Sequence, residues 1–377
     1  MILDFEIPVK EIERRKQLVA DVWEYKKVDH IPIMITVNSN PFGYTMHDEL
    51  FSKERQLQLR LASVKKTLEL VPDDYIPALF VNVGCVGIES ALGMEVYYGE
   101  TPDQTPGVKK HLLEDMEDVY KLKHIDPYSD GLIPEFLKRV GYFVQQTGYR
   151  IPVTCLDVNG PMAVAMNILG SENFLLGMYT NPDEIKYLLS FVMDNIISVT
   201  DACIEAAGGI NNITCTDFVW EWFPEGKKGH VSDDVSAMYK PGFFKEFSIP
   251  VNNRVYEKYG PGTIHNCGPN PCVGYYLEHT PKISGADLNF KYSRDDLPKF
   301  KKPFKGKGII YLGMEYSSHE ETLADYRYII GSLAPDVIAI PSIFIDEGMV
   351  DSGRCEVRRL YNDMLKMSKE YACRIWG

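Results

Sequence analysis

The sequence is short of the features that mark membrane, nucleic-acid-binding and disulfide-rich proteins. No stretch approaches the roughly 20 consecutive apolar residues of a transmembrane helix, and the first 17 residues hold no apolar run typical of a signal peptide. Basic residues number 40 against 53 acidic ones, a net charge of −13, which argues against binding to nucleic-acid phosphates. The eight cysteines form no CxxC pair. We therefore expect reduced thiols, a cytoplasmic protein and no membrane contact.

Repeats of fixed period and low-complexity linkers are also missing, so nothing divides the chain. The sequence has 377 residues, of which 45% are hydrophobic, enough to bury a large core. We predict a single domain over residues 1–377, with residues 1–30 forming an N-terminal helical segment that packs on it.

Short apolar runs rich in β-branched residues alternate with longer amphipathic patterns. The predicted strands cover residues 32–37, 77–83, 151–158, 211–218, 262–268, 283–290, 308–314 and 336–342. Predicted helices between them include residues 52–71, 181–209, 240–260 and 318–335. Eight such units predict an α/β fold of the (β/α)8 barrel type. An open doubly wound sheet is the alternative, but TVNSNPFGYT after the first strand is no glycine-rich phosphate loop.

Polar side chains follow these apolar strands where active sites of such barrels lie. The segment TIHNCGPNP (263–271) is the most informative, because His265 and Cys267 are two residues apart on a strand and share one face. Imidazole and thiolate are zinc ligands, and a catalytic zinc has about three protein ligands. The alternative is that His265 is a hydrogen-bonded structural residue.

Candidate residues for substrate lie at the ends of other predicted strands. They are Asn82, Asn159 and Asp217 as polar groups, and Trp220 and Trp222 in the stretch WEWF. The aromatic stretch has two interpretations: a lid or core patch, or a wall that packs a flat ring or a methylated ammonium group.

Several segments together resemble the uroporphyrinogen decarboxylase superfamily over nearly the whole chain. They include ERRKQLVADVWEYKKVDHIPI (13–33), DVNGPMAVAMNILGSENFLLGMYTNPDEI (157–185), GTIHNCGPNP (262–271) and ADLNF (286–290). The resemblance implies a (β/α)8 barrel with extra N-terminal helices. It also implies one of two activities: decarboxylation of a porphyrinogen, or methyl transfer that depends on cobalamin and zinc.

Three departures separate the chain from the decarboxylases. TVNSNPFGYT holds no arginine where that branch has an Arg-rich signature, Asn82 stands where it has an aspartate, and PSIFIDEG near the last strand holds no histidine. The methyltransferase branch holds zinc with an H-x-C pair, which His265 and Cys267 match, and with a later cysteine. Cys355 comes about a dozen residues late for that role, so Glu221 or Glu315 is the alternative third ligand.

The resemblance thus implies a zinc-dependent methyltransferase. It would move a methyl group between a small methylated substrate, such as a methoxyarene or methylamine, and cobalamin carried by a partner corrinoid protein. Asp217, Asn159 and Asn82 would act at the reacting group, and Trp220, Trp222 and Tyr98 would line the pocket. The alternatives are a decarboxylase of a tetrapyrrole or smaller acid, and a barrel that binds a tetrapyrrole or corrinoid without catalysis.

Overall fold

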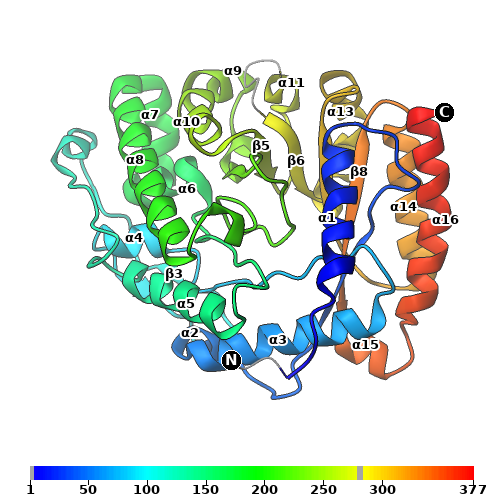
Figure 1. The fold of residues 1–377 in the computed structure, drawn as a ribbon. Helices are drawn as coiled ribbons and strands as arrows, with labels where there is room; N and C mark the ends of the chain where they lie inside the picture. Colours follow the sequence, from blue (N-terminus) through cyan, green and yellow to red (C-terminus); the bar gives the residue numbers. More distant parts are fainter. Residues whose placement is uncertain (1–3, 278–282) are drawn as a thin grey trace.

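The computed structural model describes residues 4–277 and 283–377, and its centre is a parallel six-stranded sheet surrounded by helices (Figure 1). The strand order is β1-β8-β7-β6-β5-β4, and every neighbouring pair is parallel. The strands are β1 Met34–Asn38, β4 Gly229–Ser232, β5 Gly262–Asn266, β6 Ile283–Asn289, β7 Ile309–Glu315 and β8 Ile338–Asp346. A separate antiparallel pair joins β2 Val96–Tyr97 to β3 Gly107–Val108.

The wall of the barrel continues beyond β4 through single bridges rather than ladders. Thr216 N–H donates to the carbonyl of Lys228 next to β4. Ile213 then bridges Val153, and Val153 bridges Leu79, both in parallel. The strands predicted at residues 77–83, 151–158 and 211–218 are therefore present in the wall only as isolated bridges. Among residues 4–277 and 283–377, no backbone pairing joins the Leu79 segment to β1, so the barrel has an open seam there.

The other predicted strands are confirmed, with shifts at their ends, whereas β2, β3 and β4 were not predicted, and of these only β4 belongs to the wall. β4 is only four residues long, and all four are buried. β8 runs to Asp346, four residues past the predicted end, because it pairs with both β1 and β7. The (β/α)8 type of fold holds, with an uneven distribution of hydrogen bonds around the wall.

Helices cover the outside of the wall (Figure 1). Serine side chains cap the predicted helices at residues 52–71 and 318–335, where Ser52 accepts from Arg55 N–H and Ser318 accepts from Glu321 N–H. The helices of eight or more residues are α1 Val9–Trp23, α3 Lys53–Leu70, α5 Ile133–Gln146, α6 Gly160–Leu169, α7 Ser171–Thr180, α8 Pro182–Ala206, α10 Ile249–Tyr259, α13 Leu297–Phe304, α14 His319–Leu333 and α16 Val357–Trp376. Shorter ones are α2 Met46–Phe51, α4 Gly87–Ala91, α9 Pro241–Phe243, α11 Val273–Tyr276, α12 Phe290–Ser293 and α15 Glu347–Asp351.

The predicted N-terminal helical segment is α1, whose last residue reaches into the core. The indole N–H of Trp23 donates to the hydroxyl of Tyr311 at 3.0 Å, and its ring packs against Phe223 with centroids 5.1 Å apart. This contact ties α1 to β7 and to the loop after Asp217. Residues 1–3 of the predicted segment lie outside the described residues.

One helix, α8, is long and apolar enough by length and composition to cross a membrane, which the sequence analysis did not anticipate. Sixty-one per cent of its most apolar window is buried inside the protein. The packing of α8 against α5, α6 and α7 accounts for this composition, as in the core helix of an α/β domain.

Candidate functional site

Three side chains with metal-binding atoms meet where β5 ends. Asp234, His265 and Cys267 each offer one atom, and these atoms lie within 4.8 Å of one another. His265 Nε2 is 3.3 Å from Cys267 Sγ and 3.7 Å from Asp234 Oδ2. The backbone completes the arrangement, since Cys267 N–H donates to Asp234 Oδ1 at 2.6 Å. We call this group the donor triad.

A second carboxylate fixes the orientation of His265. Asp287 is the neighbour of His265 in the β5–β6 register, and its Oδ2 lies 2.7 Å from His265 Nδ1. The contact turns Nε2 toward Cys267 and Asp234. Burial opposes charge on the imidazole, but the Asp287 carboxylate prevails and raises the pKa of His265 well above its ordinary value. A carboxylate behind a metal-binding histidine is the usual partner of zinc sites.

The donor triad suits zinc by its chemistry. Carboxylate oxygen, imidazole nitrogen and thiolate sulfur are all zinc ligands, and three protein ligands leave a position for substrate. The side chain of Asp234 is 43% exposed while that of His265 is 10% exposed, so the group can be reached from outside yet is anchored in the wall. The residues present therefore fit the metal that the sequence resemblance implies.

Asp234, the third member of the triad, is none of the three residues expected to complete the zinc site, which were Cys355, Glu221 and Glu315. Cys355 lies elsewhere in the described chain, after the end of α15. Its N–H donates to the carbonyl of Met349 in that helix, and its thiol lies beside Tyr316. Glu315 is exposed at the end of β7. Neither residue joins a metal-binding group among residues 4–277 and 283–377. Cys355 and Glu315 were expected because of where they stand relative to the predicted strands. Asp234 comes from the segment after β4, a strand that was not predicted.

Glu221 lies near the triad without belonging to it. Burial and the Asp287 carboxylate raise the pKa of Glu221 to about 7, and the charge of His265 partly offsets this effect. Glu221 also lines the cavity described below, so it faces both the cavity and the surroundings of His265.

The predicted polar residues on the next segments of the wall are held by internal hydrogen bonds. Asp217 accepts from Phe218 N–H at 2.8 Å and from the Ser232 hydroxyl at 3.0 Å. Asn159 donates to Cys85 O at 3.1 Å. Burial, followed by repulsion from Asp157, raises the pKa of Asp217 to about 8.

The backbone at Asn159 and Gly160 brings α6 close to β4. Asn159 has φ 52° and Gly160 has φ 78°, both in the left-handed region. A Cβ on Gly160 would lie 1.7 Å from the carbonyl oxygen of Ser232. Only glycine permits this approach, which sets Asn159 beside the strand that precedes Asp234.

The raised pKa of Asp217 predicts how the free energy of unfolding of the metal-free protein depends on pH. Folding raises the pKa of Asp217 from about 3.8 to about 8. The stabilisation that this carboxyl group gives the folded state is therefore complete below pH 4 and is lost as the pH rises toward 8. Asp217→Asn should remove this dependence. We expect the variant to lose about 1–2 kcal/mol less stability than the wild type between pH 6 and pH 8 in urea unfolding. Parallel losses in the two proteins would contradict the prediction.

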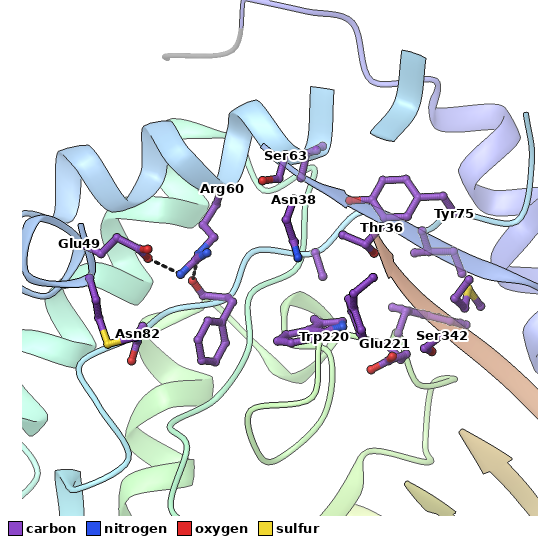
Figure 2. A pocket seen from close by; sticks show the side chains of 18 residues that line it. Thr36, Asn38, Glu49, Arg60, Ser63, Tyr75, Asn82, Trp220, Glu221 and Ser342 are labelled. Atoms are coloured by element: carbon purple, nitrogen blue, oxygen red, sulfur yellow. Dashed lines mark hydrogen bonds and ion pairs between the residues drawn. The ribbon is translucent and has the colours of Figure 1, made fainter. Parts of the chain in front are cut away.

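A cavity of about 370 Å³ lies at the open seam between β1 and the Leu79 segment (Figure 2). Its aromatic wall is Trp220 between Phe80 and Phe344, with ring centroids 5.7 and 5.1 Å apart and both pairs of rings inclined at 82°. Asn82, Glu221 and Ser342 line it as well. Trp220, predicted to line the substrate pocket, and Asn82, predicted to act at the reacting group, thus both line this cavity.

The other two aromatic candidates are placed differently. Trp222 borders both this cavity and a second hollow beside α1, and its ring lies 5.5 Å from Lys16 Nζ and 5.3 Å from Lys228 Nζ. Tyr98 is not among the cavity-lining residues. Its ring packs against Phe51 with centroids 5.0 Å apart.

Three polar residues of the site were missed in the sequence. Asp287 stood inside a predicted strand, two positions before Asn289, and a carboxylate in an apolar strand was the signal for it. Asp234 follows the short strand GHVS, which looks like a loop in the sequence. His230 lies in that strand: burial lowers its pKa to about 3, its Nδ1 is 2.7 Å from the Thr263 hydroxyl, and its ring centroid is 6.4 Å from that of His265.

Comparison with known proteins shows which family and fold the chain shares. A family model described as uroporphyrinogen decarboxylase (URO-D) matches residues 15–302. Among solved structures, a methyltransferase from Methanosarcina mazei is similar, with a TM-score of 0.67 and 16% sequence identity. The match covers 94% of this chain and 98% of that chain, and at this identity it reflects a shared fold. No curated protein matches the sequence.

Proposed function

We propose that this chain, which belongs to the uroporphyrinogen decarboxylase family, is a zinc-dependent methyltransferase. It would move a methyl group between a small methylated substrate and cobalamin carried by a partner corrinoid protein. The observation that carries the proposal is the donor triad of Asp234, His265 and Cys267 at the carboxyl end of β5. Active sites of (β/α)8 barrels lie at this end of the strands.

Each residue of the site has a distinct task in this proposal. The donor triad holds zinc, which when bound supplies a Lewis acid for the heteroatom that carries the methyl group. Asp287 keeps His265 Nε2 directed at the metal position. Asn159 and Asp217 shape the adjoining wall, and Asn82 lines the cavity that receives the body of the substrate. In the transfer, the heteroatom would leave with the electron pair of its bond to the methyl carbon, and the reduced corrinoid of the partner protein would supply the electron pair for the new bond to that carbon.

The charges around the site argue against decarboxylation of a porphyrinogen. Carboxyl groups of Asp157, Asp217 and Glu221 surround the triad, whereas a polycarboxylate substrate needs cations. Arg60 is the one basic residue that lines the cavity within residues 4–277 and 283–377, and it forms an ion pair with Glu49. Decarboxylation of a smaller acid, or binding of a corrinoid without catalysis, is a weaker candidate because neither explains the donor triad.

The corrinoid would be carried by a separate protein. The β runs predicted in the sequence are used by one wall, and no segment resembles a cobalamin-binding domain with its own histidine loop. The cysteines are free, as expected for a cytoplasmic enzyme, and we propose that location.

The proposal is tested by following the cobalamin spectrum. Zinc-loaded protein should convert reduced corrinoid, free or on a carrier protein, to methylcobalamin with a methylamine or methoxyarene as donor. His265→Ala should abolish the conversion. Uroporphyrinogen should not be decarboxylated in an anaerobic assay. Formation of coproporphyrinogen in proportion to enzyme would instead support the decarboxylase. Stoichiometric corrinoid retained through gel filtration would rule out the separate carrier.

A further inference from the structure

We propose that Asp233 and Asn266 are positioning residues, which hold Asp234 in place so that the donor triad is formed before the metal arrives. This inference rests on the proposed function, because it concerns the same zinc site. Neither Asp233 nor Asn266 contributes an atom to the donor triad. The observations that carry the inference are the buried hydrogen bonds that tie the segment of Asp234 to β5 and to α10.

The third ligand lies on a different element from the other two. His265 belongs to β5 and Cys267 directly follows it, whereas Asp234 begins the short 3-10 turn Asp234–Met238. The β4–β5 ladder ends at the pair Ser232 and His265, two residues before Asp234. Because a metal requires its ligands at closely defined distances, other bonds must fix the turn.

The backbone and the carboxylate of Asp233 anchor both ends of this turn. The N–H of Asp233 donates to the carbonyl of His265 at 2.9 Å, which extends the pairing of β4 with β5 by one bond. Its carboxylate accepts from the hydroxyl of Tyr239, just after the turn, at 3.2 Å and from Asn252 Nδ2 of α10 at 3.3 Å. The side chains of Asp233, Tyr239 and Asn252 are all buried, so a loss of these bonds is costly.

Asn266 links the turn to the strand that carries the other two ligands. It stands between these ligands in the sequence, and its side chain is fully buried. Its Nδ2 donates to the Ser236 hydroxyl at 2.6 Å and to the Asp233 carbonyl at 3.2 Å, and its Oδ1 accepts from Gly268 N–H at 2.7 Å. A displacement of the turn would break these bonds, so Asn266 couples the position of Asp234 to that of β5.

All of these bonds join protein groups to one another. The Asp234 carboxylate itself accepts from Cys267 N–H at 2.6 Å, which orients the third ligand toward the other two. Zinc that binds such a preformed group does not have to order the turn first. The ordering of the turn by Asp233 and Asn266 therefore increases the affinity for zinc.

Zinc affinity measures this positioning without methyl transfer. Metal-free protein is titrated with zinc in competition with a chromophoric chelator. Asp233→Asn keeps the size of the side chain but replaces one accepting oxygen by an amide group, and Asn266→Ala removes the link to the turn. Each substitution should weaken zinc binding about tenfold, although all three ligands remain.

Asp74→Asn is the matched control for Asp233→Asn. Asp74 is also buried and also accepts from a tyrosine hydroxyl, that of Tyr361, at 3.2 Å. Its other oxygen contacts involve His30 and Ile33 just before β1, at the opposite end of the strands from the donor triad. Asp74→Asn should lower the free energy of unfolding and leave zinc affinity unchanged.

Cobalt(II) in place of zinc reports which ligands remain bound. The absorption from thiolate to cobalt in the near ultraviolet should persist in Asp233→Asn, because Cys267 is unchanged. The visible bands should shift toward those of Asp234→Ala, in which the third ligand is removed. A merely structural role of Asp233 would leave the spectrum of the folded variant as in the wild type.

Unchanged zinc affinity and an unchanged cobalt spectrum in the variants would overturn the inference and leave the proposed function standing. Equal weakening of zinc binding in Asp74→Asn would also overturn it, because the effect would then follow stability alone. A wild-type protein that binds no zinc would overturn both proposals. Weaker zinc binding in the two variants, with no methyl transfer by the wild type, would reject the transferase and keep the positioning residues.

Unfolding curves of the metal-free variants verify that they are folded. If Asn266→Ala is not, the isosteric Asp233→Asn decides alone.

Discussion

His265→Ala should strip most of the zinc from the protein while leaving the fold intact. The protein as purified without chelators is expected to hold about one zinc per chain at the donor triad. Losing one of three ligands should weaken zinc binding by several kcal/mol, given total affinities of about 10–16 kcal/mol for structural zinc. The donor triad lies at the rim of the barrel, so loss of a metal bound there should not unfold the core. Metal analysis together with melting temperature measures both effects.

Cysteine substitutions provide a matched pair for this prediction. Cys267→Ser should lose zinc, whereas Cys355→Ser should retain it, because Cys355 lies in the turn after α15 and outside the triad. Asp287→Asn should leave the ligands in place but weaken binding about 10–100-fold, since it only orients His265. Zinc content unchanged in His265→Ala, with a lower melting temperature, would identify His265 as a structural residue instead.

Arg139→Met should cause the largest loss of stability that the structure predicts. Arg139 is 2% exposed, and its guanidinium donates to the carbonyls of Glu49, Leu50 and Asn82 at 2.6–3.0 Å. These bonds hold the end of α2 against the segment that carries Asn82. Removing them leaves the Leu50 carbonyl without its donor, while Gln56 Nε2 still donates to the carbonyls of Glu49 and Asn82. We expect a loss of about 2–3 kcal/mol in urea unfolding.

An exposed arginine serves as the control for Arg139. The side chain of Arg359 is 66% exposed and lies 4.0 Å from Asp363. Arg359→Met should change stability by no more than about 0.5 kcal/mol. Equal small effects of the two substitutions would mean that water replaces the bonds of Arg139 without cost.

Long segments of regular pattern were predictable from the sequence because local chemistry determines them. The helix α8 begins at Asn181-Pro182 and ends before Gly208 and Gly209, as the start and stop signals predicted. β5, β6 and β7 agree with their predicted runs within two residues at each end. In these elements, burial of apolar side chains and backbone pairing favour the same conformation.

Elements whose form depends on distant partners were not predictable to the same degree. The run at residues 151–158 has the composition of a strand, but only Val153 forms bridges there, because its neighbours in the wall are also irregular. β4 has four residues and no alternating pattern, so Asp234 behind it was missed. The pair His265 and Cys267 was predictable because both lie on one strand, whereas Asp234 and Asp287 reach them only through the register of neighbouring strands.

The uneven wall gives the two sides of the site different resistance to local opening. His265 and Asp287 lie on strands whose register is unbroken from Thr263–Gly285 to Asn266–Leu288, and separating them requires several backbone hydrogen bonds to break together. Phe80 and Asn82 lie beyond the last of a few single bridges, next to a seam without pairing. The free energy needed for local opening is therefore higher on the side of His265 and Asp287 than on the side of the Leu79 segment. Any widening of the cavity would therefore come from the Leu79 segment, which side chains such as Arg139 hold in place, and the donor triad would keep its position.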